Sequence, residues 1–477
     1  MFQFDAGISR SGRANLKNSF RQIPGSICAP RGFKCAAVFC DIKKLGTGKG
    51  SEKGQKRDLA LVVSDVPAAV AGMFTSNQVC AAPVKVSAKR AANKSARAIV
   101  ANSGNANACT GNQGLKDARE MTRIAAEAVA AVYDRRRSEM SALAERRYRI
   151  QESGVLVCST GRIGVPMPMK NVERGIRECA PLLARSTRSA RQVAEAIMTT
   201  DTCRKEIAIE FKIDNRAVRI GGICKGAGMI QPGMTRSSGR HATMLAFITS
   251  DATIDSRLLK RALEIAVSQS FNRMTVDGDM STNDSVIMLA NGLARNRPLA
   301  RNRSGIGVSP RRDFGIFQAA LTHVCLELAK MIVRDGEGAT RLITLHVDGA
   351  RSVGEAESAA RSIANSSLVR TSWCGGDPNW GRILCALGYS SAHVDETIID
   401  VGYANPASRK IIFAFQRGRP TNGVLNALAQ ITSAPEFDLY VDLHCGRGKF
   451  VLYASDLTEN YVTLNKGDMN DPSSLGG

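Results

Sequence analysis

The sequence predicts a mixed α/β fold, of the α+β kind, in which helices cover β-sheets. The segment 207–220 alternates apolar and polar residues around a turn at Asp214 and Asn215, which is typical of a β-hairpin. Two later segments, 258–267 and 317–332, repeat apolar residues at helical spacing. Because strands and helices do not alternate as a regular βαβ repeat, the pattern favours sheets covered by helices over a doubly wound nucleotide fold.

The first part of the chain predicts strands around one polar loop. Short apolar runs at 36–39, 59–63 and 70–74 are separated by the Gly/Lys-rich segment LGTGKGSEKGQK. This segment does not match the phosphate-binding loop, since the glycine required five residues before Gly48 is replaced by Lys43. The sequence therefore does not predict a nucleotide cradle here.

A strand near 97–101 runs into a Gly/Asn-rich turn, 102–111, and then into a helix. The turn has two interpretations that the spacing leaves open, a tight turn that needs positive φ or a backbone cradle for a ligand. Further strands are predicted at 343–347, near Ile398 and at 439–443. The helix that follows the turn at 102–111 places these apolar residues on one face: Ala118, Met121, Ala125, Ala128 and Val132.

Length and composition indicate a globular protein of two or three packed units. The chain has 477 residues, 44% hydrophobic and 23% charged. Its formal net charge of +22 would attract nucleic acid, acidic surfaces or anionic small molecules. Much of this excess lies in stretches that we interpret as solvated loops or tails, with a binding footprint as the alternative. These stretches are 10–31, 135–149, 236–240 and 295–312.

Cysteine and histidine usage predicts neither a metal site nor disulfides. The 13 cysteines form no Cys-x-x-Cys pair, and the five histidines do not cluster at ligand spacing. Cysteines in apolar segments, such as Cys158 and Cys224, indicate reduced thiols. No run of about 18 apolar residues is present, so we expect no membrane span. We expect a cytoplasmic protein, with the mitochondrial matrix or plastid as the alternative if residues 1–28 are a transit peptide.

The usual hydrolase signals are absent. The sequence contains no Gly-x-Ser-x-Gly elbow and no acidic pair at a distinctive spacing. What remains is the segment KGAGMIQP at 225–232, a short basic stretch, and Thr243 at the head of an apolar run. A single threonine in that position is usually structural, so the pattern alone does not identify a nucleophile.

Nine motifs together resemble the ornithine acetyltransferase family, also called glutamate N-acetyltransferase. They occur in the family's order over nearly the whole chain, from about residue 29 to about residue 466, which makes the match specific. The motifs are ANSGNANACTG (101–111), STGRIGVPMPM (159–169), AEAIMTTDT (194–202), KGAGMI (225–230), ATMLAFITSDA (242–252), SFNRMTVDGDMSTNDS (270–285), VRDGEGAT (333–340), DPNWGRI (377–383) and YVTLN (461–465).

The resemblance implies an αββα sandwich of two β-sheets flanked by helices, shared with certain aminopeptidases, plus a smaller C-terminal α/β unit from about residue 340. It also implies self-cleavage between Ala242 and Thr243. The expected division is an N-terminal extension 1–28, an α chain that continues through 29–242, and a β chain 243–477. Two such pairs would assemble into a heterotetramer. No metal or cofactor is implied, apart from acetyl-CoA as a co-substrate of bifunctional members.

The implied activity is transfer of an acetyl group from N2-acetylornithine to glutamate. Thr243 would be the nucleophile, and the hydroxyl of Thr160 and the backbone N–H of Gly161 would bind the oxyanion. Without the family, Thr160 and Gly161 fit an ordinary turn, Lys225 a solvated strand end and Glu337 a loop or cap residue. The implied substrate-binding residues are Thr199, Lys225, Thr243, Glu337 and Asn465.

The chain departs from the family's pattern at several positions. The segment 235–241 is inserted next to the expected cleavage site, and the Arg-rich stretches 133–149 and 294–312 are predicted to loop out on the surface. Met280 replaces the usual threonine, and Asn470 replaces a hydroxyl residue of the substrate site. Two alternatives follow: a related amidase or aminopeptidase that transfers the acyl group to water, or an inactive relative whose basic surface binds nucleic acid or an acidic partner.

Overall fold

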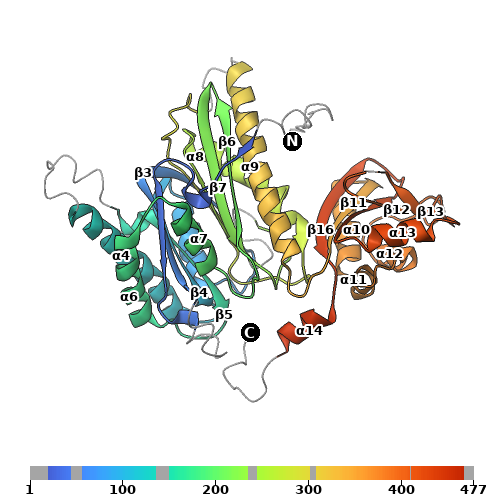
Figure 1. Cartoon of the computed structure of the whole chain (residues 1–477), viewed down its shortest axis with the longest axis horizontal. Helices are drawn as coiled ribbons and strands as arrows, with labels where there is room; N and C mark the ends of the chain where they lie inside the picture. The colour runs from blue at the N-terminus through green and yellow to red at the C-terminus, as the bar shows by residue number, and fades with distance from the viewer. Residues whose placement is uncertain are drawn as a thin grey trace.

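A computed structural model describes residues 20–43, 56–135, 150–234, 244–300, 308–408 and 410–466, with only the backbone described at 134–135 and 308–311. The described strands form a nine-stranded and a seven-stranded sheet (Figure 1). Helices cover both, which confirms the predicted mixed α/β class. The expected cleavage point, Ala242–Thr243, and Asn470 lie outside the described residues.

The nine-stranded sheet has the order β1-β6-β7-β8-β10-β3-β4-β5, with β2 also paired to β3. Strand β8 runs parallel to β10, and β4 runs parallel to β5. The strands are β1 (Arg21–Gln22), β2 (Phe33–Val38), β3 (Leu59–Phe74), β4 (Ser95–Asn105), β5 (Val155–Arg162), β6 (Lys205–Ile213), β7 (Arg216–Lys225), β8 (Leu245–Ser250) and β10 (Ser285–Ala290).

Strand β3 joins two halves of this sheet that pack face to face. Its first part pairs with β2, and its second part pairs with β10 on the same edge. Side chains alternate accordingly: Leu245 and Phe247 of β8 face the core between the halves, while Ala246 and Ile248 face outward. The inner core contains side chains from both halves, such as Val62 of β3. This layering confirms the αββα sandwich, with the difference that β3 hydrogen-bonds its two sheets into one.

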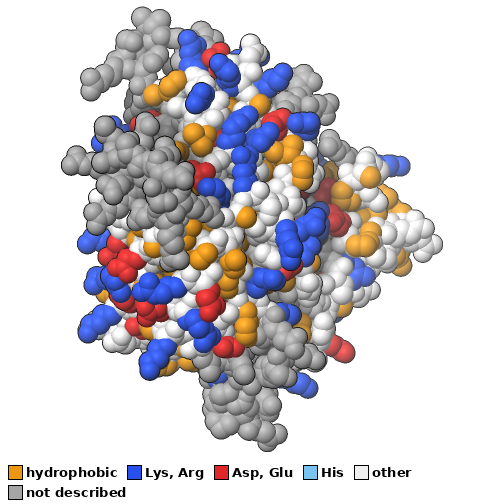
Figure 2. All heavy atoms as spheres, turned by 60° about the vertical axis from the view of Figure 1, so that its left-hand side comes forward, with side chains coloured by type: hydrophobic (Ala, Val, Ile, Leu, Met, Phe, Trp, Pro, Cys, Tyr) orange, Lys and Arg blue, Asp and Glu red, His pale blue; other side chains and the backbone are white. Residues whose placement is uncertain are grey.

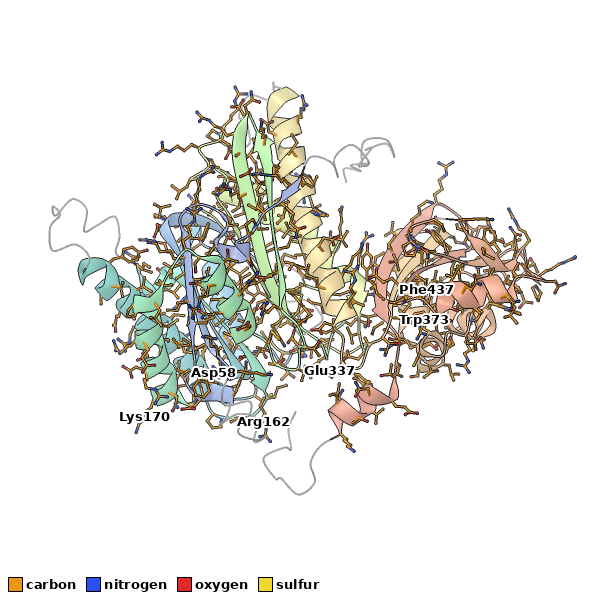
Figure 3. All side chains as sticks on the ribbon, in the orientation of Figure 1. Asp58, Arg162, Lys170, Glu337, Trp373 and Phe437 are labelled. Carbon is orange, nitrogen blue, oxygen red and sulfur yellow. The ribbon has the colours of Figure 1, made fainter. Side chains whose placement is uncertain are left out.

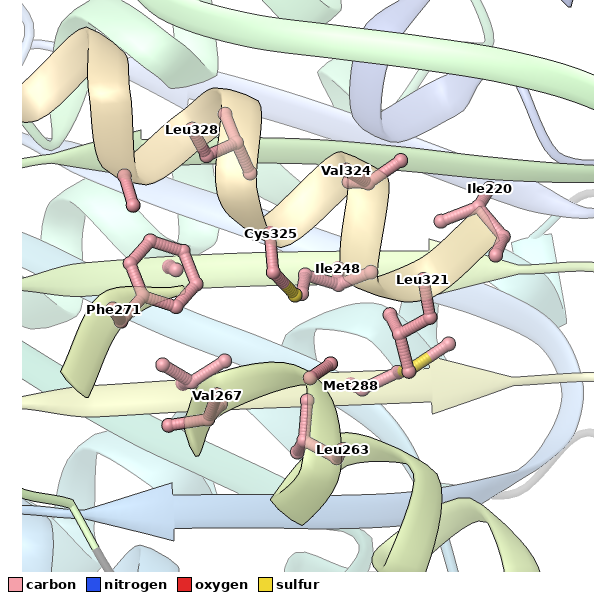
Figure 4. Close-up of a cluster of buried hydrophobic side chains, with 14 of the residues drawn as sticks. Ile220, Ile248, Leu263, Val267, Phe271, Met288, Leu321, Val324, Cys325 and Leu328 are labelled. Atoms are coloured by element: carbon pink, nitrogen blue, oxygen red, sulfur yellow. The ribbon is translucent and has the colours of Figure 1, made fainter. Parts of the chain in front are cut away.

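Helices close the outer faces. On one side, α4 and α6 pack over β3, and on the other, α8 and α9 pack over β7, β8 and β10 (Figures 1 and 4). Helices α3 and α7 extend the core between the halves. The helices are α3 (Ala82–Ala91), α4 (Gly111–Arg135), α6 (Met169–Cys179), α7 (Thr187–Ala196), α8 (Ser256–Ser268) and α9 (Val308–Arg334), and the short 3-10 turns are Ser26–Cys28, Glu152–Gly154, Ala180–Leu182 and Phe271–Arg273.

The predicted hairpin is confirmed, because β6 and β7 pair from Ile213↔Arg216 onward and both turn residues, Asp214 and Asn215, have positive φ. The prediction of separate strands at 59–63 and 70–74 is wrong, since β3 is continuous. The polar stretch between the two apolar runs ends at Pro67, which has no backbone N–H. There the β3–β4 register shifts between Val63 and Ala68, so the strand absorbs the break as a bulge.

The seven-stranded sheet has the order β14-β13-β12-β15-β11-β16-β9. One face packs against α10 to α13, and α9 contacts β11 and β16. Its strands are β9 (Met274–Thr275), β11 (Leu342–Ala350), β12 (Asp400–Ala404), β13 (Ile412–Gln416), β14 (Arg419–Pro420), β15 (Glu436–Asp442) and β16 (Gly448–Ser455). The remaining helices are α10 (Val353–Asn365), α11 (Ser367–Cys374), α12 (Trp380–Gly388), α13 (Leu425–Thr432) and α14 (Glu459–Asn465).

The Arg-rich stretch 294–312 does not simply loop out as predicted. Leu299 is buried and pairs with Ile254, and α9 already begins at Val308. Within α9, the span Arg312–Arg334 is long and apolar enough to cross a membrane by length and composition alone. In this fold its apolar face, which includes Leu321 and Leu328, packs against α8 and the outer face of the sheet (Figure 4). The helix is therefore a core helix here.

Candidate active site

One end of the sandwich collects the polar side chains that the motifs singled out. Strand β7 ends at Lys225, which pairs with Leu245 at the start of β8. Strand β5 ends at Arg162, directly after Thr160 and Gly161, and Figure 3 shows Arg162 and Glu337 at the same lower end of the molecule. The ends of β7 and β5 thus bring Lys225 next to Thr160, which lies 65 positions earlier in the sequence.

Lys225 joins two of the predicted site residues. Its ammonium group donates hydrogen bonds to Thr160 Oγ1 at 3.3 Å and to Thr199 Oγ1 at 2.8 Å. The side chain is buried, which makes the interpretation as a solvated strand-end charge wrong. Burial lowers the pKa of Lys225, and the nearby carboxylate of Asp201 opposes this shift. The site therefore contains a buried cation whose bonded partners are neutral hydroxyls.

Gly161 stands where no other residue fits. Its φ is +132°, and a Cβ there would lie 2.3 Å from the carbonyl carbon of Gly104. Gly104 in turn has φ of +100°, and a Cβ there would lie 2.6 Å from Cα of Lys43. Three backbone segments are therefore stacked at this corner, which requires glycine at both positions. The turn at 102–111 contributes Gly104 to this stacking. Its interpretation as a ligand cradle stays a prediction.

A buried ion network fixes the loop that carries Thr199. Asp201 accepts hydrogen bonds from the backbone N–H of Thr199 at 3.0 Å and of Gly226 at 2.7 Å. Lys205 donates to Asp201 at 2.7 Å and also bonds Asp335. Burial raises the pKa of Asp201, but Lys225 and Lys205 outweigh it and lower the pKa to about 2. Through Asp201 and Lys205, this network ties the backbone at Thr199 and Gly226 to Asp335, the residue after α9.

The sequence analysis missed this network, since nothing in the spacing pairs residues 130 positions apart. A signal was nevertheless present, because Asp201 lies inside the motif AEAIMTTDT and Asp335 inside VRDGEGAT. An acidic residue in a motif that ends a helix or precedes a strand is a candidate partner for a buried cation.

Glu337 and Asn465 form a second hydrogen-bonded pair of predicted site residues, and the charge of Glu337 acts on Lys225. Asn465 Nδ2 donates to Glu337 Oε2 at 2.8 Å, and the Glu337 backbone N–H donates to the carbonyl of Ala227 at 2.8 Å. The Glu337 carboxylate lies against Gly228, where a Cβ would stand 2.4 Å from Oε2. Glycine at 228 thus makes room for the carboxylate. Figure 3 shows Glu337 between the lower end of α9 and α14.

The segment KGAGMI is held from a second direction by Asp277. This carboxylate accepts hydrogen bonds from the backbone N–H groups of Met229 at 2.5 Å and Ile230 at 2.8 Å. Met229 has a φ of +58°, a conformation that such bonds stabilise. Lys225 therefore belongs to a segment whose backbone is fixed at both ends, by Asp201 at Gly226 and by Asp277 at Met229 and Ile230.

The start of β8 lies in the same region. Ala242 and Thr243 fall outside the described residues, but the next residue, Met244, is buried and its carbonyl accepts a hydrogen bond from the Ser285 N–H at 2.9 Å. The preceding residue Asp284 is buried, and neither carboxylate oxygen has a hydrogen-bond partner among the described residues. Burial raises the pKa of Asp284 well above its usual range, and Lys225 opposes the shift.

Asn283 connects the β10 side to the β5 side. Its amide donates to the carbonyl of Ala106 at 2.6 Å and to the carbonyl of Ser159 at 2.8 Å, one residue before Thr160. Among the described residues, no group of three or more His, Cys, Asp or Glu side chains could hold a metal ion. The described site offers the hydroxyls of Thr160 and Thr199 and the buried ammonium of Lys225, on which the charge of Glu337 acts.

The comparison with known families decides the identity. The model of the ArgJ family matches residues 43–467. This chain belongs to the ArgJ family. Membership confirms the resemblance stated above and the prediction that the chain is an enzyme.

Relatives in the ArgJ family cover almost the whole chain. The chain is 42% identical over 443 residues to the "Arginine biosynthesis bifunctional protein ArgJ" of Symbiobacterium thermophilum, covering 93% of this chain and 98% of that protein. It is 40% identical over 450 residues to the "Glutamate N-acetyltransferase" of Methanocaldococcus jannaschii, covering 93% and 98%.

Solved structures of the ArgJ family are similar in sequence to part of the chain. The ornithine acetyltransferase of Mycobacterium tuberculosis, solved with ornithine, is 34% identical and covers 45% of this chain and 100% of its own, with a TM-score of 0.37. The ArgJ protein of Bacillus halodurans is 32% identical, covers 45% and 98%, and has a TM-score of 0.38.

Proposed function

We propose that this ArgJ-family enzyme transfers an acetyl group from N2-acetyl-L-ornithine to L-glutamate in arginine biosynthesis. The observation that carries the proposal is the buried Lys225 ammonium bonded to the hydroxyls of Thr160 and Thr199, at the strand end where β8 begins two residues after Thr243. The names of the relatives agree with this activity. The acetyl group would be carried on the Thr243 hydroxyl.

Thr243 would become the nucleophile through self-cleavage. Its hydroxyl attacks the carbonyl of Ala242, the amide bond is exchanged for an ester, and water hydrolyses the ester to leave Thr243 with a free α-amine. An α-amine has a pKa of about 7.7 to 8.0, so a fraction is neutral near neutral pH and can accept the hydroxyl proton. Nucleophile and base would then belong to one residue, as in other N-terminal threonine enzymes.

The charges of the site fit the donor. A substrate α-carboxylate would bind the Lys225 ammonium, and the side-chain ammonium of acetylornithine would bind the Glu337 carboxylate, which Asn465 orients. Thr160 and Gly161 would donate to the oxyanion during attack on the acetyl carbonyl. Ornithine leaves, and the amine of glutamate then attacks the acetyl ester, which regenerates the Thr243 hydroxyl. This is a ping-pong sequence.

Two extensions belong to the proposal. Relatives at about 42% identity are named bifunctional, so we include acetyl-CoA as a second acetyl donor to the same hydroxyl. We also propose that residues 1–242 and 243–477 remain associated as α and β chains, with two of each in a cytoplasmic heterotetramer. Both would be checked by acetylation of glutamate from acetyl-CoA and by the mass of the native assembly.

The surface over α4 and α6 does not favour the alternative of a nucleic-acid-binding relative. On the face that carries α4 and α6, basic and acidic side chains are interspersed (Figure 2). Arg123 pairs with Glu120 and Glu127, and Arg177 pairs with Glu173. Neighbouring charges of opposite sign weaken the field that a polyanion would follow.

The decisive assay separates transfer from hydrolysis. Purified protein is given acetylornithine with and without glutamate, and ornithine and acetylglutamate are quantified. We expect ornithine release to depend on glutamate and to match acetylglutamate formation, and the Thr243→Ala variant to form neither. Ornithine release at the same rate without glutamate would identify the amidase alternative, and salt-sensitive binding to DNA without any acetyl transfer would identify the inactive relative.

A further inference from the structure

The polarity of the hydrogen bonds around Lys225 is fixed by chemistry. A lysine ammonium carries three donors and no acceptor, whereas a threonine hydroxyl carries one donor and two lone pairs. In the bonds to Thr160 at 3.3 Å and to Thr199 at 2.8 Å, the hydroxyl oxygens must therefore accept. Each of these hydroxyls keeps its own hydrogen for another partner.

Those hydrogens are not used within the described part of the chain. Thr160 is 1% exposed and Lys225 is 3% exposed, yet no described acceptor takes the hydroxyl hydrogen of Thr160 or of Thr199. The third N–H of Lys225 also lacks a described acceptor. A buried hydroxyl whose hydrogen has no described acceptor is prepared for a ligand oxygen that carries negative charge.

We propose that Lys225 is a positioning residue for the oxyanion donor: by donating to Thr160 Oγ1, its ammonium holds the Thr160 hydroxyl hydrogen toward the oxyanion formed in the reaction. This rests on the proposed function, in which Thr160 stabilises that oxyanion. Lys225 thus acts on the chemical step through Thr160, in addition to any carboxylate it binds. A mere substrate anchor would not act on a substrate that lacks a carboxylate.

The charged groups around Lys225 act on it through the electrostatic field, and none of the described carboxylates forms a hydrogen bond or an ion pair with its ammonium. Asp201 and Lys205 come from the loop and strand beside it, Glu337 from the end of α9, Asp284 from the start of β10 and Lys43 from the segment before β3. Asp201 is engaged by Lys205 and two backbone N–H groups, and Glu337 by Asn465. Because no carboxylate bonds Lys225 in the described structure, its donors stay on the two hydroxyls.

The first experiment uses p-nitrophenyl acetate, an acetyl donor without carboxylate or ammonium. The rate of acetylation is measured as the burst of p-nitrophenolate, normalised to the cleaved fraction from intact mass. We expect Thr160→Ala to slow acetylation by about 100-fold, the loss typical of one oxyanion donor. Lys225→Met should slow it by roughly tenfold or more, and adding Lys225→Met to Thr160→Ala should cost less than about threefold more.

The matched control is Lys212→Met, which replaces an exposed lysine on β6 of the same hairpin and should react like the wild type. The proposal is overturned if Lys225→Met is acetylated at the wild-type rate while its KM for acetylornithine rises, since Lys225 would then be only a carboxylate anchor. It is also overturned if the two substitutions multiply fully in the double variant.

A second measurement, the pH dependence of the burst rate, uses only the wild type and so does not depend on self-cleavage of a variant. Burial lowers the pKa of Lys225, so the wild-type ammonium loses its proton below the range of an ordinary lysine, near 10.4. The neutral amine has a lone pair and can accept a hydrogen bond. The Thr160 hydroxyl can then donate its hydrogen to Lys225 instead of to the oxyanion. We expect the burst rate of the wild type to fall at a pH below the one at which an ordinary lysine loses its proton. A rate that stays level until an ordinary lysine would titrate contradicts the proposal.

The outcome for the proposed function is read separately on the same preparation. If the wild type shows the expected pattern with p-nitrophenyl acetate but forms no acetylglutamate from acetylornithine, the proposed substrates are wrong and the role of Lys225 stands. If it forms acetylglutamate while Lys225→Met is unaffected in the burst, the proposed function stands and the role of Lys225 is wrong.

Discussion

Two buried lysines on neighbouring strands show how this fold separates its scaffold from its site. Lys205 on β6 lies opposite Cys224, the residue before Lys225 on β7. Lys205 bonds the carboxylates of Asp201 and Asp335, whereas Lys225 bonds the hydroxyls of Thr160 and Thr199. The charge of Lys205 is therefore balanced by carboxylates of the protein itself. Lys225 has no bonded carboxylate in the described structure, so a ligand can supply one.

The pKa shifts of the two lysines follow this difference. Burial lowers the pKa of both, but at Lys205 the two carboxylates outweigh burial and raise the pKa, while at Lys225 burial prevails. A buried charge without a bonded counter-ion costs stability, and proteins retain such groups where function needs them. The comparison therefore indicates a structural role for Lys205 and supports the proposed role of Lys225 in the reaction.

The same substitution at the two lysines should change the free energy of unfolding by very different amounts. Lys205→Met leaves Asp201 and Asp335 buried without their cation, so we expect a loss of about 3 to 5 kcal/mol in the free energy of unfolding. Lys225→Met removes a charge that no carboxylate bonds, and should change that free energy by no more than about 1 kcal/mol. Urea denaturation at pH 7 measures both.

The control is Arg334→Ala, which removes an exposed pair with Glu436 and should cost less than about 1 kcal/mol. Equal losses at Lys205 and Lys225 would mean that the two clusters do not differ in the way described here.

Glu337→Gln tests the carboxylate that Asn465 bonds, and we expect a smaller effect than for Lys205→Met. The substitution keeps the shape beside Gly228 and removes the charge proposed for the ornithine ammonium. Loss of a charge-assisted hydrogen bond corresponds to about 10- to 100-fold, and we expect it mainly in KM for acetylornithine. Steady-state kinetics with acetylornithine and with p-nitrophenyl acetate check this, because the latter has no ammonium and should be unaffected. A similar loss with both donors would place Glu337 in the chemical step instead.

Asp284→Asn tests the pH dependence of stability. Burial raises the folded-state pKa of Asp284 above its unfolded value, so the folded state retains the proton longer. The resulting stability is full below the unfolded pKa and is lost as pH rises toward the folded pKa. The amide cannot ionise, so the variant should gain stability over the wild type as pH rises from the unfolded pKa toward the folded pKa, as measured by urea denaturation from about pH 4 to pH 8. Parallel stability curves over this range would show that Asp284 is not held protonated.

The sequence predicted the residues of the site but not how they are held. Motif resemblance identified Thr160, Thr199, Lys225, Glu337 and Asn465, and the structure brings them to one end of the sandwich. Spacing alone gave them ordinary alternatives, since burial depends on the whole fold. It is burial that distinguishes Lys225 from a solvated strand end.

Long-range pairing accounts for what the sequence could not predict. The hairpin at Asp214 and Asn215 was predictable because its turn and its alternation are local. The continuity of β3 was not, because its halves are stabilised by different partners, β2 and β10, that lie before and far after it in the chain. The network of Asp201, Lys205 and Asp335 likewise spans β6 and the end of α9.

The central claim, that Thr243 is a nucleophile released by self-cleavage, is tested most directly by intact mass and N-terminal sequencing of the purified protein. We predict two fragments, one beginning Thr243-Met244-Leu245, and a single uncut chain for Thr243→Ala. A wild-type chain that stays uncut after prolonged incubation at neutral pH, or that is cut at another bond, would contradict the account.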